Sequence, residues 1–342
     1  MAHRPLLWSP CSTPYPTVPC SSGDCAAVAS GSGTPKSCTG QRPCTVRPTN
    51  PVTGEQAAGN LTFTDISTNA TDGKTPTAVV TVHGVLSSCA PVSLLRSFPG
   101  AAAGDAGLGR ELYAKLSLKR QLAICLPSVT DAPGVAFLGS GPYGFLPFAL
   151  LDASDLAYTD LVKNSPSSSS SSASYGIRLS GIAVNQEAVP LAAGVVSVTF
   201  DTALPYTVLR RDVYRAFVDT YRSAMAGVPR VPGVAPFEAC FNSSGLGVTR
   251  VGYAVPFVDL MTEGGGGNWT VWGSNLVTQV ATDVACLAFV YGGWAAPSAM
   301  VLGGFQMENN LLVFDEANSR FGFTGTLLFI RTTCSNFNFT RG

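Results

Sequence analysis

The sequence predicts a protein that is built mainly of β-strands and divided into two domains. Its 342 residues are too many for one ordinary domain and enough for two. Only 12% of the residues are charged and 46% are hydrophobic, so the chain has ample apolar surface to bury. The 36 glycines and 24 prolines favour turns over long helices. Together these observations indicate an all-β protein with a few short helices.

The first half begins with loops and continues in strands. Residues 1–58 are rich in Cys, Pro and Ser and have little periodicity, which is typical of loops held by disulfides. Runs of apolar and β-branched residues predict strands at 61–63, 78–82 and 134–138. The segment 110–121 (RELYAKLSLKRQ) has the helical pattern of this half.

A serine-rich segment at 165–174 (SPSSSSSSAS) predicts a flexible linker or exposed loop. Beyond it, alternation of apolar and polar residues predicts strands at 175–184 and 194–200. The strongest helix pattern covers 211–226, where Val213, Phe217, Tyr221 and Ala224 recur at helical spacing. We therefore expect three parts, an N-terminal lobe, a linker and a C-terminal lobe, at residues 1–160, 161–174 and 175–342.

The ten cysteines fit disulfides better than a metal site. No C-x2-C pair occurs, and neither His3 nor His83 stands at zinc-ligand spacing from a cysteine. An even number of scattered cysteines is typical of proteins from an oxidising compartment. We expect no metal, no cofactor and five disulfides among these residues: Cys11, Cys20, Cys25, Cys38, Cys44, Cys89, Cys125, Cys240, Cys286 and Cys334.

Five N-x-S/T sequons agree with secretion and predict glycosylation. They are Asn60, Asn69, Asn242, Asn268 and Asn338. The opening residues, MAHRPLLW, lack the apolar core of a signal peptide. We predict an extracellular protein because cysteines and sequons occur throughout the chain, and we expect its N-terminus to be incomplete.

The charges argue against two classes of partner. The 21 basic and 21 acidic residues cancel, so we expect neither a nucleic-acid surface nor a basic membrane-binding patch. The stretch 284–305 is uncharged and long enough to span a bilayer. Its Gly292, Gly293 and Pro297 predict a turn between two buried strands instead.

Several segments resemble a plant family. They are residues 6–11 (LLWSPC), 19–22 (PCSS), 200–209 (FDTALPYTVL), 301–310 (VLGGFQMENN) and 331–340 (RTTCSNFNFT). Together they resemble the pepsin-like glycosidase inhibitors. This family includes xylanase inhibitors of the TAXI type, xyloglucan-endoglucanase inhibitor proteins, dermal glycoprotein and basic 7S globulin. The tail is most similar to the endoglucanase-inhibitor side of the family.

The resemblance covers nearly all of the chain and implies a bilobal, pepsin-like fold with a central cleft, truncated at its N-terminus. It also implies a secreted plant-defence glycoprotein of the apoplast or cell wall. Finally, it implies five disulfide pairs, which are Cys11–Cys89, Cys20–Cys44, Cys25–Cys38, Cys125–Cys334 and Cys240–Cys286.

An aspartic peptidase needs two Asp carboxylates that share a proton, each in an Asp-Thr/Ser-Gly loop. Asp201 stands at the second of these positions, but Ala203 replaces the glycine. The residues just before Leu6 (AHRP) include no acid, so the first Asp is missing. We therefore predict an incomplete dyad and a pseudoenzyme rather than an active peptidase.

The family resemblance points to inhibition through arginine. A glycosidase site holds two carboxylates roughly 5–10 Å apart, and a planar guanidinium can bond both. Relatives on the endoglucanase-inhibitor side present arginines from loops, and the matching positions here are Arg331 and Arg250. TAXI-type inhibitors use a histidine in this region of the tail. The expected partner is therefore a microbial glycoside hydrolase, with an endoglucanase favoured over a xylanase.

Two alternatives remain open. One is a secreted aspartic endopeptidase whose first catalytic Asp lies upstream of Met1. The other is a binding or storage protein of the 7S-globulin type.

Overall fold

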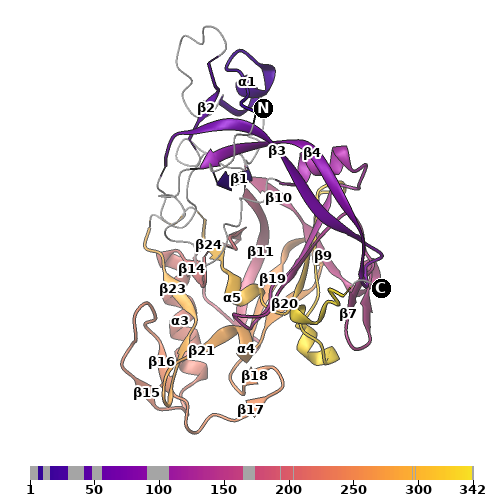
Figure 1. Ribbon diagram of the computed structural model, residues 1–342. Coiled ribbons are helices and arrows are strands. Elements are labelled where there is room, and N and C mark those ends of the chain that lie inside the picture. Colours follow the sequence, from indigo (N-terminus) through magenta and orange to yellow (C-terminus); the bar gives the residue numbers. More distant parts are fainter. Residues whose placement is uncertain are drawn as a thin grey trace. The chain divides into compact units, whose positions relative to one another are not determined.

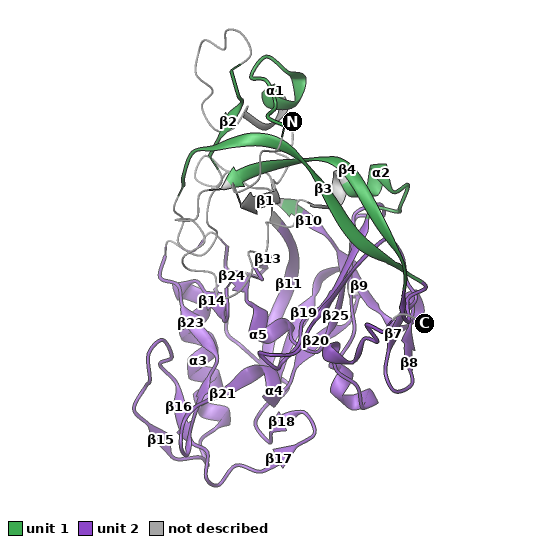
Figure 2. Cartoon of the chain, viewed as in Figure 1, with its two compact units in different colours: residues 1–71, 77–120, 163–174 green, residues 72–76, 121–162, 175–342 purple. Residues whose placement is uncertain are grey.

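Strands make up most of the regular structure, and the helices are few and short (Figure 1). This confirms the predicted all-β class. The computed structural model describes residues 7–10, 16–29, 42–47, 56–90, 108–164, 174–192, 194–202, 204–294, 296 and 298–340. The chain forms two compact units, which Figure 2 colours green and purple. Their residues are 1–71, 77–120 and 163–174 for the first unit, and 72–76, 121–162 and 175–342 for the second.

The first unit contains a four-stranded sheet with the order β1–β4–β3–β2. Its elements are β1 (Leu7–Pro10), α1 (Gly23–Ala29), β2 (Thr45–Val46), β3 (Gly59–Thr71), β4 (Pro76–Ala90) and α2 (Leu108–Lys115). The strands predicted at 61–63 and 78–82 lie within β3 and β4. A small core packs Val18, Leu61 and Leu86 against two cysteines.

Helix α2 ends earlier than the sequence predicts, so the prediction of a helix over 110–121 is wrong at its C-terminal end. Ser117 adopts a left-handed conformation with φ of 53°. The N–H of Leu118 donates to the carbonyl of Tyr113, and the N–H of Ser117 donates to Ala114. This paired bonding closes a helix, and Gln121 then begins strand β5.

The second unit is built from two main sheets. A five-stranded sheet has the order β6–β5–β25–β26–β9, and a larger sheet contains the order β20–β19–β11–β13–β24–β14–β23. The strands of the five-stranded sheet are β5 (Gln121–Cys125), β6 (Val135–Leu138), β9 (Ala157–Asp160), β25 (Leu311–Asp315) and β26 (Arg320–Phe323). Those of the larger sheet are β11 (Ser174–Val184), β13 (Val196–Phe200), β14 (Thr207–Leu209), β19 (Val258–Thr262), β20 (Asn268–Val271), β23 (Phe289–Tyr291) and β24 (Met300–Leu302).

Shorter elements complete the described chain. The remaining strands are β7 (Tyr143–Phe145), β8 (Ala149–Leu151), β10 (Val162–Asn164), β12 (Glu187–Ala188), β15 (Arg230–Val231), β16 (Cys240–Asn242), β17 (Val248–Thr249), β18 (Gly252–Tyr253), β21 (Val277–Ala281) and β22 (Val284–Leu287). The remaining helices are η2 (Ala153–Asp155), α3 (Arg211–Ala224), η3 (Glu263–Gly265), α4 (Gly273–Leu276), α5 (Gly304–Met307), η4 (Leu327–Ile330) and η5 (Cys334–Asn336).

The compact units divide the chain elsewhere than at the predicted lobe boundary. Residues 121–162 cluster with the second unit, although the sequence analysis places residues up to 160 in the N-terminal lobe. The reason is long-range pairing, because β5 pairs antiparallel with β25 along its whole length and β9 pairs with β26. The serine-rich residues 165–173 lie outside the described residues.

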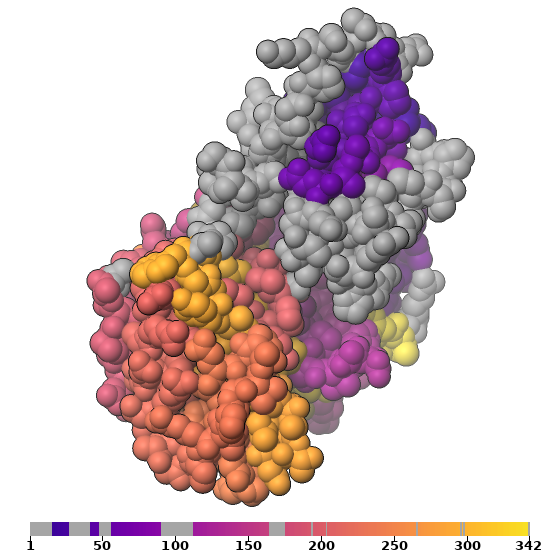
Figure 3. All heavy atoms as spheres, turned by 90° about the vertical axis from the view of Figure 1, so that its left-hand side faces the viewer, coloured from indigo at the N-terminus to yellow at the C-terminus, as the bar shows by residue number. Residues whose placement is uncertain are grey.

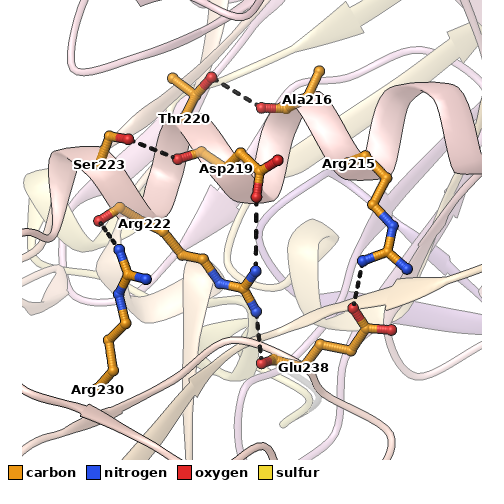
Figure 4. Close-up of polar contacts among 8 residues, drawn as sticks. All are labelled: Arg215, Ala216, Asp219, Thr220, Arg222, Ser223, Arg230 and Glu238. Atoms are coloured by element: carbon orange, nitrogen blue, oxygen red, sulfur yellow. Dashed lines mark hydrogen bonds and ion pairs between the residues drawn. The ribbon is translucent and has the colours of Figure 1, made fainter.

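Helix α3 confirms the strongest helix prediction and covers the main core. Its buried face carries Val213, Phe217 and Tyr221, as the spacing predicts, while Ala224 is exposed. On its polar face, Arg215 pairs with Glu238 at 3.4 Å, and Arg222 pairs with Asp219 at 3.7 Å (Figure 4). Figure 3 turns this side of the second unit toward the viewer.

Disulfides fix both units. Cys125–Cys334 and Cys240–Cys286 form as the family resemblance implies. The implied pairs Cys20–Cys44 and Cys25–Cys38 are wrong, because Cys25 is bonded to Cys44, which the bridge between Pro19 and Pro43 brings alongside α1. Cys20 and Cys89 are also disulfide-bonded, whereas Cys11 and Cys38 lie outside the described residues.

The uncharged stretch 284–305 does not form a long helix. It contains β22, β23 and β24 and the start of α5, with Gly292 and Gly293 between β23 and β24. This confirms the prediction of buried strands separated by a turn. Within the described ranges, no helix has the length and apolar character needed to cross a membrane.

Candidate functional site

Arg331 ends the short helix η4 in an unusual backbone conformation. Its φ and ψ are 60° and 34°, which is the left-handed helical region. Thr326 caps the start of the helix, because its side chain accepts a hydrogen bond from the N–H of Leu328. At its end, the N–H of Arg331 donates to the carbonyl of Leu328 at 3.2 Å. These bonds cap both ends of the helix and hold the Arg331 backbone in an exposed turn.

The residues that follow Arg331 anchor it. Thr332 is only 2% exposed, and its hydroxyl donates to the carbonyl of Leu146. Cys334 is bonded to Cys125 of β5, and its N–H donates to the side-chain oxygen of Asn309 at 3.1 Å. The Arg331 segment is therefore tied to three separate elements before any partner binds.

Arg250 lies at the turn of the hairpin formed by β17 and β18. The hydroxyl of Thr249 donates to the carbonyl of Gly252 at 2.9 Å and accepts from the N–H of Val251 at 3.2 Å. Gly252 has φ of 89°, and a Cβ there would collide with the backbone of Ser274. The turn thus needs glycine for both its conformation and its close approach to α4.

The two arginine-bearing segments pack against the same short stretch of chain at α4. The N–H of Ser274 donates to the carbonyl of Val251, next to Arg250, at 2.7 Å. Trp272, which precedes α4, packs edge-on against Phe329 of η4 with ring centroids 5.2 Å apart. Figure 1 shows β17, β18 and α4 close together, with the yellow C-terminal segment alongside. The structure therefore brings the neighbourhoods of Arg250 and Arg331 together on one side of the second unit.

Most other arginines of this unit have side-chain contacts inside the chain. Arg178, Arg210, Arg215, Arg222 and Arg320 pair with carboxylates. In addition, Arg230 donates to the carbonyl of Arg222 (Figure 4), and Arg211 lies over the ring of Trp294. By contrast, Arg250 and Arg331 are exposed, and their guanidinium groups make no hydrogen bond or ion pair with the residues that the structure describes.

Asp201 directly follows β13, where the second catalytic Asp of a pepsin-like peptidase is expected. It is half-buried, and its N–H donates to the carbonyl of Leu302 at 3.0 Å. The next turn is held by the fully buried Gln306, whose side-chain oxygen accepts from the N–H and the hydroxyl of Thr207 at 2.9 and 2.7 Å. Ala203 lies outside the described residues.

The sequence does not single out Gln306 and Thr207, because neither belongs to a residue pattern with an assigned chemistry. Gln306 also donates to the carbonyls of Asn275 and Ala288, so one amide ties β14, α4 and the link between β22 and β23 together. Such a fully satisfied buried amide stabilises the loops around Asp201. Among the described residues, no group of three His, Cys, Asp or Glu could hold a metal ion.

The predicted glycosylation sites fall into two groups. Asn60, Asn69 and Asn268 are exposed on strands. Asn242 and Asn338 are half-buried, and their side-chain oxygens accept hydrogen bonds from Ser244 and Thr340, the hydroxyl residues of their own sequons. Glycosylation at all five stays a prediction.

Comparison with known proteins agrees with the fold. Chitinase CLP of Oryza sativa subsp. japonica is 44% identical over 363 residues, which cover 98% of this chain and 84% of the rice protein. The crystal structure of edgp matches with a TM-score of 0.89 at 34% identity, covering 99% of this chain and 90% of that chain. Basic 7S globulin from soybean matches with a TM-score of 0.79 at 29% identity, covering 99% and 90% of the two chains.

Two family models match most of the sequence. The model described as xylanase inhibitor N-terminal matches residues 3–140, and the model described as xylanase inhibitor C-terminal matches residues 174–325. The pepsin-like fold expected from the resemblance agrees with these matches and with the structural neighbours. The chain therefore belongs to the xylanase-inhibitor family.

Proposed function

We propose that this protein is a secreted, non-catalytic member of its family that inhibits microbial cell-wall glycoside hydrolases. In this proposal Arg331 enters the active site of the hydrolase, and Arg250 supports it from the neighbouring hairpin. One observation carries the proposal. Two exposed arginines without a side-chain partner among the described residues lie on turns that pack against the same stretch of chain at α4.

The chemistry of the target explains why arginine suits this task. A glycoside hydrolase holds two carboxylates roughly 5–10 Å apart on either side of the sugar bond. A guanidinium group presents several N–H donors in one plane and stays charged at every pH at which these enzymes work. Since Arg331 and Arg250 form no ion pair with any described residue, binding to a carboxylate costs them only their solvation and side-chain freedom.

The anchoring of Arg331 reduces a further cost of binding. Its turn is held by the disulfide of Cys334 and by the buried hydrogen bond of Thr332. A segment that is already ordered loses little backbone entropy when a partner binds. This supports a protein inhibitor whose binding loop is already ordered before it meets the hydrolase.

An endoglucanase is the favoured target over a xylanase. The family resemblance places a histidine in the tail of TAXI-type xylanase inhibitors, whereas this chain has Phe329, Ile330 and Arg331 there. A histidine would make inhibition depend on its own protonation near pH 6 to 7, while arginine does not titrate in that range.

The test is an inhibition panel with the purified protein. It contains a family 12 xyloglucan endoglucanase, a family 11 xylanase, a chitin substrate and an acid-protease substrate. The chitin assay is included because the rice relative is named a chitinase. We expect the endoglucanase to be inhibited and neither substrate to be hydrolysed.

Other results would favour the alternatives. Peptide cleavage that Asp201→Asn abolishes would favour the endopeptidase. Absence of both inhibition and hydrolysis across the panel would contradict the proposal and favour a storage role.

A further inference from the structure

Large apolar side chains are exposed on two joined segments, the one that contains Arg331 and the hairpin between β7 and β8. Two segments supply six of the exposed large hydrophobic residues in the described part of the chain. We call them the apolar collar: Leu146, Phe148, Leu150, Phe329, Ile330 and Phe339. Phe148 stands out because 94% of its surface is accessible, at the tip of the hairpin between β7 and β8. Apolar surface gathered in one place marks an interaction site, whereas single exposed apolar residues do not.

Hydrogen bonds join the two segments of the apolar collar. The N–H of Leu146 donates to the carbonyl of Asn336 at 2.8 Å, and the carbonyl of Leu146 accepts from the hydroxyl of Thr332. The side chain of Asn336 donates to the same hydroxyl at 3.3 Å. The hairpin tip with Phe148 is therefore fixed next to the residue that follows Arg331. Figure 1 shows β7 beside the C-terminal end of the chain.

The base of the hairpin is rigid. All three residues of β7 are buried, and the hydroxyl of Tyr143 accepts from the side chain of Gln121 at 2.7 Å. Phe137 packs against the rings of Tyr143 and Phe337, at 5.1 and 5.3 Å between centroids. The exposed tip thus stands on a packed aromatic base, which lowers the entropy that a partner must overcome to bind it.

The charge of this surface limits what can bind it. Within residues 143–151 and 326–340, Arg331 is the only charged residue. Aromatic residues and arginine, with few lysines and acids, are typical of the centre of protein–protein interfaces. A fitting partner presents a carboxylate opposite Arg331 and apolar side chains around it. A second copy of this chain does not fit, since a two-fold interface pairs identical surfaces and supplies no carboxylate from these segments.

We propose that the apolar collar, with Phe148 as its main contact, docks on the rim of the acidic cleft into which Arg331 inserts. The proposal rests on the proposed function, because its partner is the same glycoside hydrolase. It assigns the β7–β8 hairpin to recognition, as a second contact region beside the arginine-bearing loops. Phe148 provides apolar contact area, and Arg331 provides the charge.

The experiment measures inhibition constants against the family 12 endoglucanase for the wild type, Phe148→Ala and Arg331→Ala. Trp294→Ala is the matched control, because Trp294 is also an exposed aromatic residue, 66% accessible, but follows β23 on another part of the unit. We expect Phe148→Ala to weaken inhibition at least about tenfold, Phe148→Tyr to retain it, and Trp294→Ala to leave it unchanged. Because Phe148 is almost fully exposed, its replacement is expected to leave folding intact, which a thermal melt checks.

The outcomes separate the two proposals. If the wild type inhibits and Phe148→Ala inhibits equally well, the docking proposal is overturned and the inhibitory function stands. If the wild type inhibits neither the endoglucanase nor the family 11 xylanase, the function itself fails, and the docking proposal fails with it. Sedimentation of the free protein adds one check, since a dimer that Phe148→Ala dissociates would assign the apolar collar to self-association and overturn the proposal.

Discussion

Arg331 combines an exposed cation with a backbone conformation that residues other than glycine rarely adopt. The left-handed region costs such a residue about 1 kcal/mol, and strained residues of this kind gather at functional sites. The hydrogen bonds of η4 and the disulfide of Cys334 hold Arg331 in this conformation. A glycine would fit the same turn without strain, so the arginine is better explained by what its side chain does.

This explanation predicts opposite effects of Arg331→Gly on folding and on inhibition. We expect the variant to melt at the wild-type temperature or slightly above it, because glycine is the favoured residue at the left-handed end of a helix. We also expect inhibition to weaken by at least about 2 kcal/mol, the cost of a lost charge-assisted contact. Calorimetric melting and an inhibition titration measure the two effects. A lower melting temperature with normal inhibition would show that Arg331 serves the fold instead.

Glu308 is a second residue of interest, because its environment makes the stability of the protein depend on pH. It follows α5, and burial raises its pKa from 4.5 to about 7. The folded protein therefore holds this proton more tightly than the unfolded chain does. Its contribution to the free energy of unfolding falls as the pH rises from about 4.5 to 7 and is constant outside that window.

The variant Glu308→Gln has a neutral amide at this position, which does not titrate between pH 5 and pH 8. We expect the stability of Glu308→Gln relative to the wild type to be higher at pH 8 than at pH 5, because only the wild type carries a half-buried charge at the higher pH. Melting temperatures of both proteins at the two pH values test this. An equal difference at pH 5 and pH 8 would contradict the raised pKa.

At the scale of elements, helix α3 shows that an apolar pattern predicts which side chains are buried but not whether their polar atoms find a hydrogen-bond partner. Its apolar spacing predicts the buried positions of Val213, Phe217 and Tyr221. The pattern does not reveal that the hydroxyl of Tyr221 is buried with no hydrogen-bond partner among the described residues. A buried hydroxyl without a partner is unfavourable.

We therefore expect Tyr221→Phe to stabilise the protein by about 1 kcal/mol. Tyr143 of β7 is the control, because its side chain is also buried and its hydroxyl accepts a hydrogen bond from the side chain of Gln121 at 2.7 Å, which Tyr143→Phe loses. Denaturant unfolding of the two variants gives the comparison. A loss of stability in Tyr221→Phe as large as that in Tyr143→Phe would mean that the Tyr221 hydroxyl has a partner.

Other elements show which features a local sequence pattern can predict and which it cannot. The strands β3, β4, β11 and β13 are predictable because their apolar runs are local. The end of α2 at Lys115 is not, since Ser117 closes the helix through backbone bonds that no side-chain pattern encodes. Phe148 is missed as well, because residues 143–151 are apolar throughout and such a run gives no sign of which side chain is exposed.

For the whole molecule, the sequence predicts two lobes along the chain, whereas the compact units follow long-range strand pairing. The strands β5 and β25 lie nearly two hundred residues apart in the chain, and their pairing places residues 121–162 with the second unit. Local periodicity carries no information about such a partner. The disulfides show the same limit, since the long-range pair Cys125–Cys334 follows from the family resemblance, while among the crowded early cysteines the resemblance misassigns Cys25 and Cys44.

The candidate site is likewise only partly predictable from the sequence. Arg331 and Arg250 are found through the resemblance, but their common packing against the stretch at α4 through Trp272 and Ser274 appears only in the folded chain. The zero net charge of the whole molecule gives no hint of either residue. The proposed function depends on these two local cations rather than on an overall field.

The central claim is tested most directly by the inhibition constant of Arg331→Ala against the family 12 endoglucanase. Arg211→Ala is the matched control, because Arg211 is an exposed arginine that already contacts Trp294. The account predicts at least about thirtyfold weaker inhibition for Arg331→Ala, which corresponds to about 2 kcal/mol, and unchanged inhibition for Arg211→Ala. Equal inhibition by the wild type and Arg331→Ala would contradict it.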